Sequence, residues 1–227
     1  MGLFPIPTNH KEHYLHCPLC TNTTQTFTDE KTTIVYYHCK NCHYIFKSPK
    51  HYQTIKEQKA RYDLHQNNEE DTGYIAYFNR FIDFMNPHIT KVENALDFGC
   101  GCSTLLANIL KEKGIECDVY DPLYYPTLKS NKKYDLIVST EVFEHLHNPK
   151  EVFASLVEKL KPNGYLALQT QFHNNEIETF KKWYYHHDTT HIVFFRSETF
   201  RVLGEMYGCR LIADNGKNMV ILQKNML

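Results

Sequence analysis

The stretch that most constrains the fold is residues 95–122, ALDFGCGCSTLLANILKEKGIECDVYDP. An apolar strand is predicted over 94–98, and a glycine-bearing turn follows it. The turn ends in Ser103, which is expected to cap an amphipathic helix. A second strand is predicted over 116–120, and an acid, Asp121, comes directly after it. A strand, a helix and a second strand in this order predict an α/β fold.

The turn and the acid together form a pattern typical of an adenosyl-cofactor site. The backbone must approach such a ligand closely after the first strand, and Gly99 and Gly101 allow this because they have no Cβ. A carboxylate at the end of the second strand, here Asp121, suits the ribose hydroxyls. A nicotinamide or flavin site would favour GxGxxG, whereas Ser103 and Thr104 follow Gly101 here. The sequence therefore favours S-adenosylmethionine over a dinucleotide.

Four blocks in this order resemble the class I S-adenosylmethionine-dependent methyltransferases, namely DFGCG, YDP, YDLIVSTEVFEHL and LKPNGYLAL. The resemblance covers residues 74–227 and implies a Rossmann-like sheet with a terminal antiparallel hairpin. The strand pattern on either side of Asn215-Gly216 predicts that hairpin independently. The resemblance further implies a set of cofactor-binding residues: Asp97, Gly99, Cys100, Gly101, Asp121, Pro122 and Glu141. The alternative is an ordinary doubly wound domain with another ligand.

The segment between Asp121 and Asp135 departs from the family pattern, because only thirteen residues separate these two acids. A helix and a third strand would normally occupy it, so both must be very short or one must be missing. The acid that usually reads the adenine amine after that strand has no identifiable counterpart. Tyr124 and Tyr125 are the candidates for stacking on adenine.

Two CxxC pairs near the amino terminus, Cys17–Cys20 and Cys39–Cys42, are separated by eighteen residues. This spacing is typical of a zinc ribbon, in which two knuckles direct four thiolates at one ion. Residues 32–37 are β-branched or aromatic and predict a strand between the knuckles, and 44–46 predict another. The sequence therefore predicts a ribbon over residues 1–50 with one structural Zn²⁺, because so small a unit lacks a core of its own.

Residues 51–73 are predicted to be a helical linker between the ribbon and a methyltransferase domain over 74–227. In the family this stretch often folds over the methionine end of the cofactor. By that resemblance Tyr62 is a candidate cofactor contact and His65 a candidate substrate contact, and a solvated linker helix is the alternative. The next helix has apolar residues at helical spacing from Tyr74 to Met85, and this face is expected to be core.

Three ionisable side chains follow the strand predicted over 134–139, namely Glu141, Glu144 and His145. Ligands of open α/β sheets bind at this edge, and His145 titrates near neutral pH. His145 and Glu144 are therefore candidate catalytic residues, with His145 as a base for a hydroxyl or amine acceptor. A structural role is the alternative. Some quinone-type O-methyltransferases use a similar ExxEH for a divalent metal, which is a less favoured interpretation here.

An insertion over residues 172–196 is where class I enzymes usually build the acceptor pocket. Its string WYYHHDTTHIVFF resembles a group of bacterial ribbon-bearing methyltransferases and, more loosely, sugar C-methyltransferases. Aromatic walls with His or Asp hydrogen bonders suit a small polar or ring-shaped acceptor. His191 is a third catalytic candidate, and the candidate substrate residues here are Trp183, Tyr185, His186 and Asp188. A helix that packs its aromatics on the sheet is the alternative.

Composition limits the partners. The net charge of −1 argues against a broad nucleic-acid surface, and no apolar run approaches the ~20 residues of a membrane span. The start of the chain does not resemble a signal peptide, so a cytoplasmic protein is expected. The favoured function is methyl transfer to a small-molecule acceptor, a sugar or other metabolite. An RNA or tRNA base methyltransferase whose ribbon binds nucleic acid, and a non-catalytic cofactor-binding regulator, are the alternatives. The sequence leaves the oligomeric state open.

Overall fold

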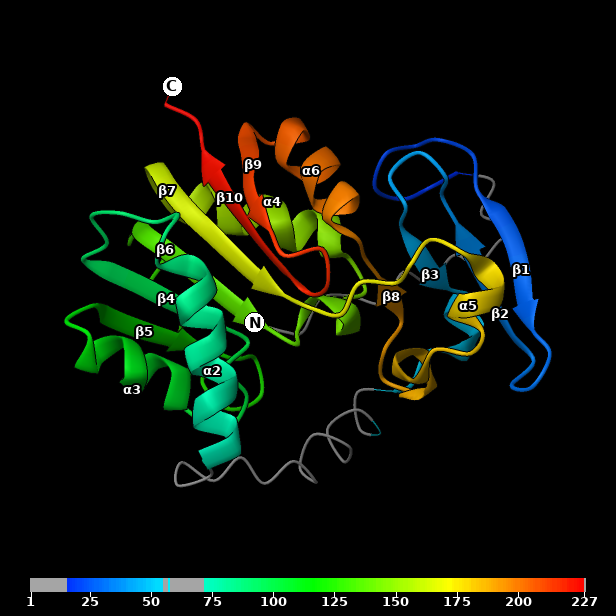
Figure 1. Ribbon diagram of the computed structural model, residues 1–227, viewed down its shortest axis with the longest axis horizontal. Coiled ribbons are helices and arrows are strands. Elements are labelled where there is room, and N and C mark those ends of the chain that lie inside the picture. The colour runs from blue at the N-terminus through cyan, green and yellow to red at the C-terminus, as the bar shows by residue number, and fades with distance from the viewer. Residues whose placement is uncertain (1–15, 55–56, 58–71, 227) are drawn as a thin grey trace.

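Two β-sheets organise the chain in the computed structural model, which describes residues 16–54, 57 and 72–226 (Figure 1). The larger sheet has the strand order β5-β4-β6-β7-β10-β9, and the smaller one has the order β1-β2-β3-β8. The larger sheet belongs to the predicted α/β part of the chain, and the first three strands of the smaller sheet belong to the predicted ribbon.

The larger sheet is mixed. Four neighbouring strands run parallel: β4 (Asn94–Phe98), β5 (Glu116–Tyr120), β6 (Tyr134–Thr140) and β7 (Leu160–Gln169). Two strands extend it in antiparallel fashion: β10 (Met219–Lys224) beside β7, and β9 (Cys209–Asp214) beside β10. The predicted Rossmann-like sheet with a terminal antiparallel hairpin is therefore confirmed.

Four helices cover the two faces of this sheet: α2 (Thr72–Met85), α3 (Leu105–Glu112), α4 (Pro149–Lys159) and α6 (Ser197–Met206). The buried side chains of α2 and α3 share one apolar cluster with Ala95 of β4, and those of α4 and α6 share another with Leu96. Successive side chains of a strand point to opposite faces, so both faces are covered, as a parallel sheet requires. The helix cap differs from expectation. Thr104 is the N-cap of α3, and the Ser103 hydroxyl accepts a hydrogen bond from the Leu105 N–H at 3.2 Å.

The sheet has no strand beyond β5 among the described residues. The sequence predicted either a very short third strand or a missing element here, and within the described ranges the strand is missing. Residues 122–133 form a loop whose one bridge joins Asp121 to Tyr125. Lys129 and Lys132 reach back to Asp118 of β5, with Nζ–O distances of 2.9 and 2.8 Å. The short connection therefore closes over the edge of the sheet, where the family would place another strand.

The smaller sheet combines distant parts of the sequence. Its first three strands come from the cysteine-rich region: β1 (Gln25–Asp29), β2 (Ile34–His38) and β3 (Ile45–Lys47). Its fourth, β8 (Val193–Phe194), comes from the insertion after β7 and pairs antiparallel with β3. The same insertion holds a short helix α5 (Ile177–Phe180) and a 3-10 turn η3 (Tyr184–His187), and two further 3-10 turns are η1 (Pro49–His51) and η2 (Phe143–His145).

Apolar packing joins the ribbon to the rest of the chain. Tyr44 lies 5.4 Å from Phe195, which stacks on Phe200 of α6 at 4.9 Å, as ring-centroid distances. Phe27 of β1 and Phe180 of α5 meet edge to face at 5.7 Å. The ribbon is therefore built into the core, and its boundary at residue 50 remains an interpretation of the sequence. None of the helices within the described ranges is both long and apolar enough to cross a membrane.

Candidate functional site

A cavity of about 500 Å³ opens at the carboxyl ends of β4, β5 and β6. Residues from all three strand ends line it, together with Tyr74 and Phe78 of α2 and the segment around Asp188 and His191. This is the edge at which open α/β sheets bind ligands. The cavity therefore lies where the sequence predicts a cofactor and an acceptor to meet.

The glycine turn after β4 forms one wall of this cavity. Gly99 and Gly101 have φ values of +80° and +63°, in a backbone region that residues with a Cβ rarely adopt. A Cβ on Gly99 would lie 2.3 Å from Cγ2 of Val142, so the turn also packs too closely for any side chain. The Gly99 N–H donates to the Tyr120 carbonyl of β5 at 2.7 Å. A glycine is therefore required at position 99 by the backbone conformation and by the packing against Val142.

Asp121 joins this turn to the loop after β5. Its Oδ2 accepts a hydrogen bond from the Gly101 N–H at 3.2 Å. Its Oδ1 accepts from the N–H groups of Leu123 and Tyr124, at 2.8 and 3.2 Å. Pro122 and Tyr124 line the cavity beside it, as does Cys100 within the turn. The carboxylate is therefore held in a fixed position at the cavity wall.

Asp97 lies at the end of β4 and is only 3% exposed. Burial, together with the negative charge of Asp121, raises its pKa to about 7. A group of positive charge at this end of the cavity would relieve that repulsion and favour the ionised carboxylate. Asp97, Gly99, Gly101 and Asp121, four of the residues predicted to bind the cofactor, all line the cavity.

Glu141 follows β6 and takes a left-handed backbone conformation, with φ +53°. Its Oε1 accepts a hydrogen bond from the Tyr77 hydroxyl at 2.9 Å. The Tyr185 hydroxyl lies 2.8 Å from Glu141 Oε2 and 2.6 Å from Glu144 Oε1. One hydroxyl has one hydrogen, so both contacts form together only when a carboxyl carries a proton. Burial and the neighbouring Glu144 raise the pKa of Glu141 to about 8, and burial raises the pKa of Glu144.

His145 and His191 lie side by side at the cavity, with ring centroids 4.8 Å apart. Nδ1 of His145 lies 3.0 Å from the carbonyl oxygen of Thr190. Nδ1 of His191 lies 2.7 Å from the backbone carbonyl oxygen of Tyr185. A carbonyl only accepts, so each Nδ1 carries the hydrogen and each neutral ring has its lone pair on Nε2. Burial lowers the pKa of both rings, to about 3 for His191. Both imidazoles are therefore neutral at pH 7, with Nε2 as the unprotonated nitrogen.

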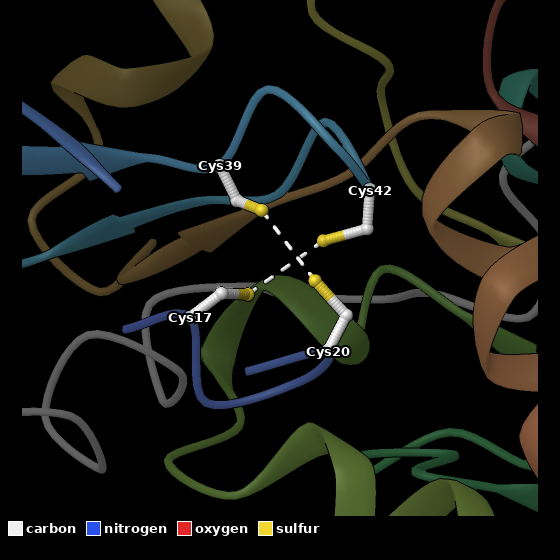
Figure 2. Close-up of side chains that lie close together, drawn as sticks. All are labelled: Cys17, Cys20, Cys39 and Cys42. Atoms are coloured by element: carbon white, nitrogen blue, oxygen red, sulfur yellow. Dashed lines mark hydrogen bonds between the residues drawn. The ribbon is translucent and has the colours of Figure 1, made fainter. Parts of the chain in front are cut away.

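The four ribbon cysteines converge on one point, as Figure 2 shows. The Sγ atoms of Cys17 and Cys42 are 3.6 Å apart, and those of Cys20 and Cys39 are 3.5 Å apart. A tetrahedral Zn²⁺ with bonds of ~2.3 Å separates its sulfur ligands by ~3.8 Å. The described residues therefore offer a four-thiolate site of the right chemistry and nearly the right size. A second group with ligand atoms mutually within 4.8 Å comprises Glu144, His145 and His191.

The predicted substrate residues separate into two sets. Asp188 lines the cavity with His191, and Tyr185 reaches it through Glu141. His186 instead turns to the ribbon, where its Nε2 lies 3.3 Å from Asp29 Oδ2. Trp183 packs on Tyr185, with ring centroids 5.0 Å apart, and is not among the residues that line the cavity. Trp183 and His186 therefore lie where the insertion meets the ribbon, and their role as substrate contacts stays a prediction.

Two further predictions, Tyr62 as a cofactor contact and His65 as a substrate contact, lie outside the described residues, as does most of the predicted linker helix. Sequence reasoning also missed two site residues in α2. Tyr74 lines the cavity and Tyr77 bonds Glu141, although their helical spacing predicted a core face. The available signal was their hydroxyl groups, since a buried tyrosine needs a hydrogen-bond partner.

The profile of the family described as "Methyltransferase domain" matches residues 67–214, and the chain belongs to that family. The ubiquinone biosynthesis O-methyltransferase of Rickettsia canadensis (strain McKiel) is 31% identical over 105 residues, which cover 36% of this chain and 44% of that protein. Its counterpart from Rickettsia akari (strain Hartford) is 30% identical over 108 residues, or 37% of this chain and 42% of that protein. The chain thus spans less than half the length of these curated relatives.

A solved structure with a similar fold is the N-methyltransferase NodS from Bradyrhizobium japonicum WM9 in complex with S-adenosyl-L-homocysteine. It is 12% identical, with a TM-score of 0.49 over 74% of this chain and 97% of that chain. An O-methyltransferase family protein from Burkholderia thailandensis has the same identity and TM-score, over 74% of this chain and 63% of that one.

Proposed function

We propose that this protein transfers the methyl group of S-adenosylmethionine to a small-molecule acceptor inside the cavity at the ends of β4, β5 and β6. The observation that supports this most directly is that one cavity holds the glycine turn and Asp121 together with the two neutral histidines. A binding pattern for an adenosyl group and a pair of neutral imidazoles therefore share one space. The family of the chain agrees with this chemistry.

The cofactor end of the proposed site is the wall formed by β4 and β5. Asp121 would accept hydrogen bonds from the ribose hydroxyls, because its carboxylate is fixed by three backbone N–H groups at the cavity edge. Asp97 and the turn at Gly99 would receive the ammonium and carboxylate of the methionine part, since a cation beside Asp97 offsets its burial. The bound cofactor supplies an electrophilic methyl group on a sulfonium.

The acceptor end is the wall formed by η2 and the segment over 188–191. His145 is suited to take the proton of an acceptor hydroxyl or amine, because its neutral ring has the lone pair on Nε2 and its Nδ1–H is held by Thr190. His191 and Asp188 would orient the acceptor at the same wall. The chain contributes mainly by placing the acceptor atom in line with the methyl group. A sugar or another small metabolite with such a group is the proposed substrate class.

The four thiolates would hold one structural Zn²⁺. Their number, spacing and burial leave no open coordination position, which is the arrangement of a structural site. The ribbon around them packs on Phe195 and α5 and shares a sheet with β8. These contacts support a role for the ribbon as a cap that is part of the fold on the acceptor side.

The experiment that tests the function is titration of the metal-loaded protein with S-adenosylhomocysteine by calorimetry, followed by a methyl-transfer screen over sugars, catechols and amines. We expect one cofactor analogue bound per chain and incorporation of radiolabelled methyl into at least one acceptor. Failure of the folded, metal-loaded protein to bind the analogue would contradict the proposed cofactor. Binding without transfer to any acceptor class would favour the regulatory alternative.

A further inference from the structure

The most unusual side chain of the ribbon is Lys47, at the end of β3. It is 1% exposed, although it carries an ammonium group on a small sheet. Burying such a charge is costly unless it is paired, and an apolar residue would pack there without that cost. Burial lowers its pKa to about 8, and the charge of Asp188 acts against that shift. The position therefore needs an explanation beyond the stability of the ribbon.

Within the described residues, the ammonium group of Lys47 forms a hydrogen bond with the segment that forms one wall of the cavity. Lys47 Nζ donates to the carbonyl oxygen of Thr189 at 3.4 Å, and the Lys47 backbone N–H donates to the Ile192 carbonyl at 2.8 Å. One residue of the ribbon thus bonds both ends of the segment 189–192, which continues directly into β8. The neighbouring Gln53 adds a contact from its Nε2 to the Thr189 hydroxyl at 2.8 Å.

The opposite side of the same segment faces the site. Asp188, Thr190 and His191 all line the cavity. The Thr190 carbonyl accepts the Nδ1–H of His145 at 3.0 Å, and the Ile192 N–H donates to the Glu144 carbonyl at 2.9 Å. The Asp188 carboxylate in turn accepts the N–H and hydroxyl of Thr190, at 2.9 and 2.7 Å. The segment is therefore held between the ribbon and the proposed base.

We infer that Lys47 is a positioning residue of the acceptor site, and that the ribbon fixes the cavity wall Asp188–His191 by holding the Thr189 carbonyl with this ammonium. Fixing Thr189 fixes the direction of the Thr190 carbonyl, which orients the His145 ring. Lys47 acts through these residues and is not itself among those that line the cavity. The assignment of the wall to an acceptor rests on the proposed function.

The test compares three variants of the metal-loaded protein. Lys47→Met removes the charge at similar length, Lys47→Arg keeps the charge, and Lys50→Met is the matched control, because Lys50 is exposed on the same ribbon. Amide hydrogen exchange is measured over 188–192, and the protonated nitrogen of His145 and His191 is read from long-range ¹H–¹⁵N spectra. Affinity for S-adenosylhomocysteine is measured in parallel, with metal content and melting temperature as controls of folding.

We expect K47M to exchange these amides about tenfold faster and to lose the uniform Nδ1–H form of His145, because the local opening energy falls. K47R and K50M should resemble the wild type, and all three variants should bind the cofactor analogue with wild-type affinity. Wild-type exchange and histidine spectra in K47M would overturn the inference. So would a loss of cofactor affinity that accompanies the loosened wall, since Lys47 would then not be specific to the acceptor side.

If K47M does not retain its metal and its melting transition, Lys47→Leu takes its place, because leucine also removes both the donor and the charge and has a shorter side chain. The same faster exchange and histidine change are expected, and their absence would again overturn the inference. Failure of the wild type itself to bind S-adenosylhomocysteine would contradict the proposed function. The exchange and spectral results would still decide whether Lys47 positions this wall.

Discussion

Asp121 offers the sharpest test of the cofactor site. The change Asp121→Asn removes one charge while keeping the side-chain size and one oxygen acceptor. In the structure the carboxylate already accepts N–H groups from Gly101, Leu123 and Tyr124, so the loop geometry depends on it as well. The variant amide oxygen can keep the bonds of Oδ1, and the amide nitrogen would face the Gly101 N–H and the ribose.

The expected magnitude follows from the hydrogen bonds that are lost. A hydrogen bond to a charged group contributes about 1.5–3 kcal/mol, and every ~1.4 kcal/mol is tenfold in affinity. Asp121→Asn should therefore weaken S-adenosylhomocysteine binding by about ten- to a hundredfold. Asp121→Ala should weaken it at least as much, because it also leaves three N–H groups without their acceptor.

The assay is calorimetric titration of the metal-loaded protein at fixed pH and salt. Asp118→Asn is the matched control, since Asp118 lies in β5, just before Asp121, but pairs with Lys129 and Lys132 at the sheet edge. The control should bind the analogue as the wild type does. An Asp121→Asn protein whose affinity stays within about twofold of the wild type would refute the ribose assignment and the energetic reasoning behind it.

Three further predictions concern stability. Removing the metal with a thiol-reactive displacer and a chelator, or changing Cys39 to Ser, should lower the melting temperature and release one Zn²⁺ per chain, measured by calorimetry and a colorimetric zinc dye; an unchanged melting curve would contradict a structural metal. Phe195→Ala should cost about 3–5 kcal/mol in chemical denaturation, because Phe195 is fully buried between Tyr44 and Phe200, whereas Tyr184→Ala, at a side chain 68% exposed, should cost under about 0.5 kcal/mol. The pKa of Asp97 is raised from 3.8 to about 7, so the native state binds a proton more tightly than the unfolded chain does. The contribution of Asp97 to the free energy of unfolding is therefore most favourable below pH 4 and declines as the pH rises to 7. Asp97→Asn should therefore gain stability relative to the ligand-free wild type by roughly 1–4 kcal/mol between pH 4 and pH 7, and a difference that does not grow with pH would contradict the shift.

Local patterns in the sequence were sufficient for the parallel part of the fold. The strands at 94–98 and 116–120 lie where they were predicted, because the first carries Ala95, Leu96 and Phe98, the second alternates Cys117 and Val119 with polar residues, and a turn signal follows each. The thirteen-residue gap after Asp121 indicated that a helix and a strand there would be very short or that one would be missing, and the described residues have no strand there. The turn was predictable from its two glycines, which take positive φ values, whereas the close contact of Gly99 with Val142 depends on a distant residue.

The remaining features depend on contacts between distant residues. β8 has only two residues, too few for any periodicity, and it exists because β3 offers a free edge. The string Tyr184–His187 has the composition of a ligand pocket, yet His186 pairs with Asp29, which lies 157 positions away. The burial of Lys47 could not be predicted from the sequence, because a lysine at the end of a strand is normally exposed.

The two-residue strand β8 has a consequence for synthesis of the chain. The knuckles leave the ribosome early and have all four thiolates once Cys42 has emerged. The edge of β3, however, stays open until Val193 and Phe194 follow, about 150 positions later, so this contact is among the last to form. Nascent chains that stall before this point would leave one edge of β3, with the apolar residues Ile45 and Phe46, unpaired, and such an edge is a template for association with other chains.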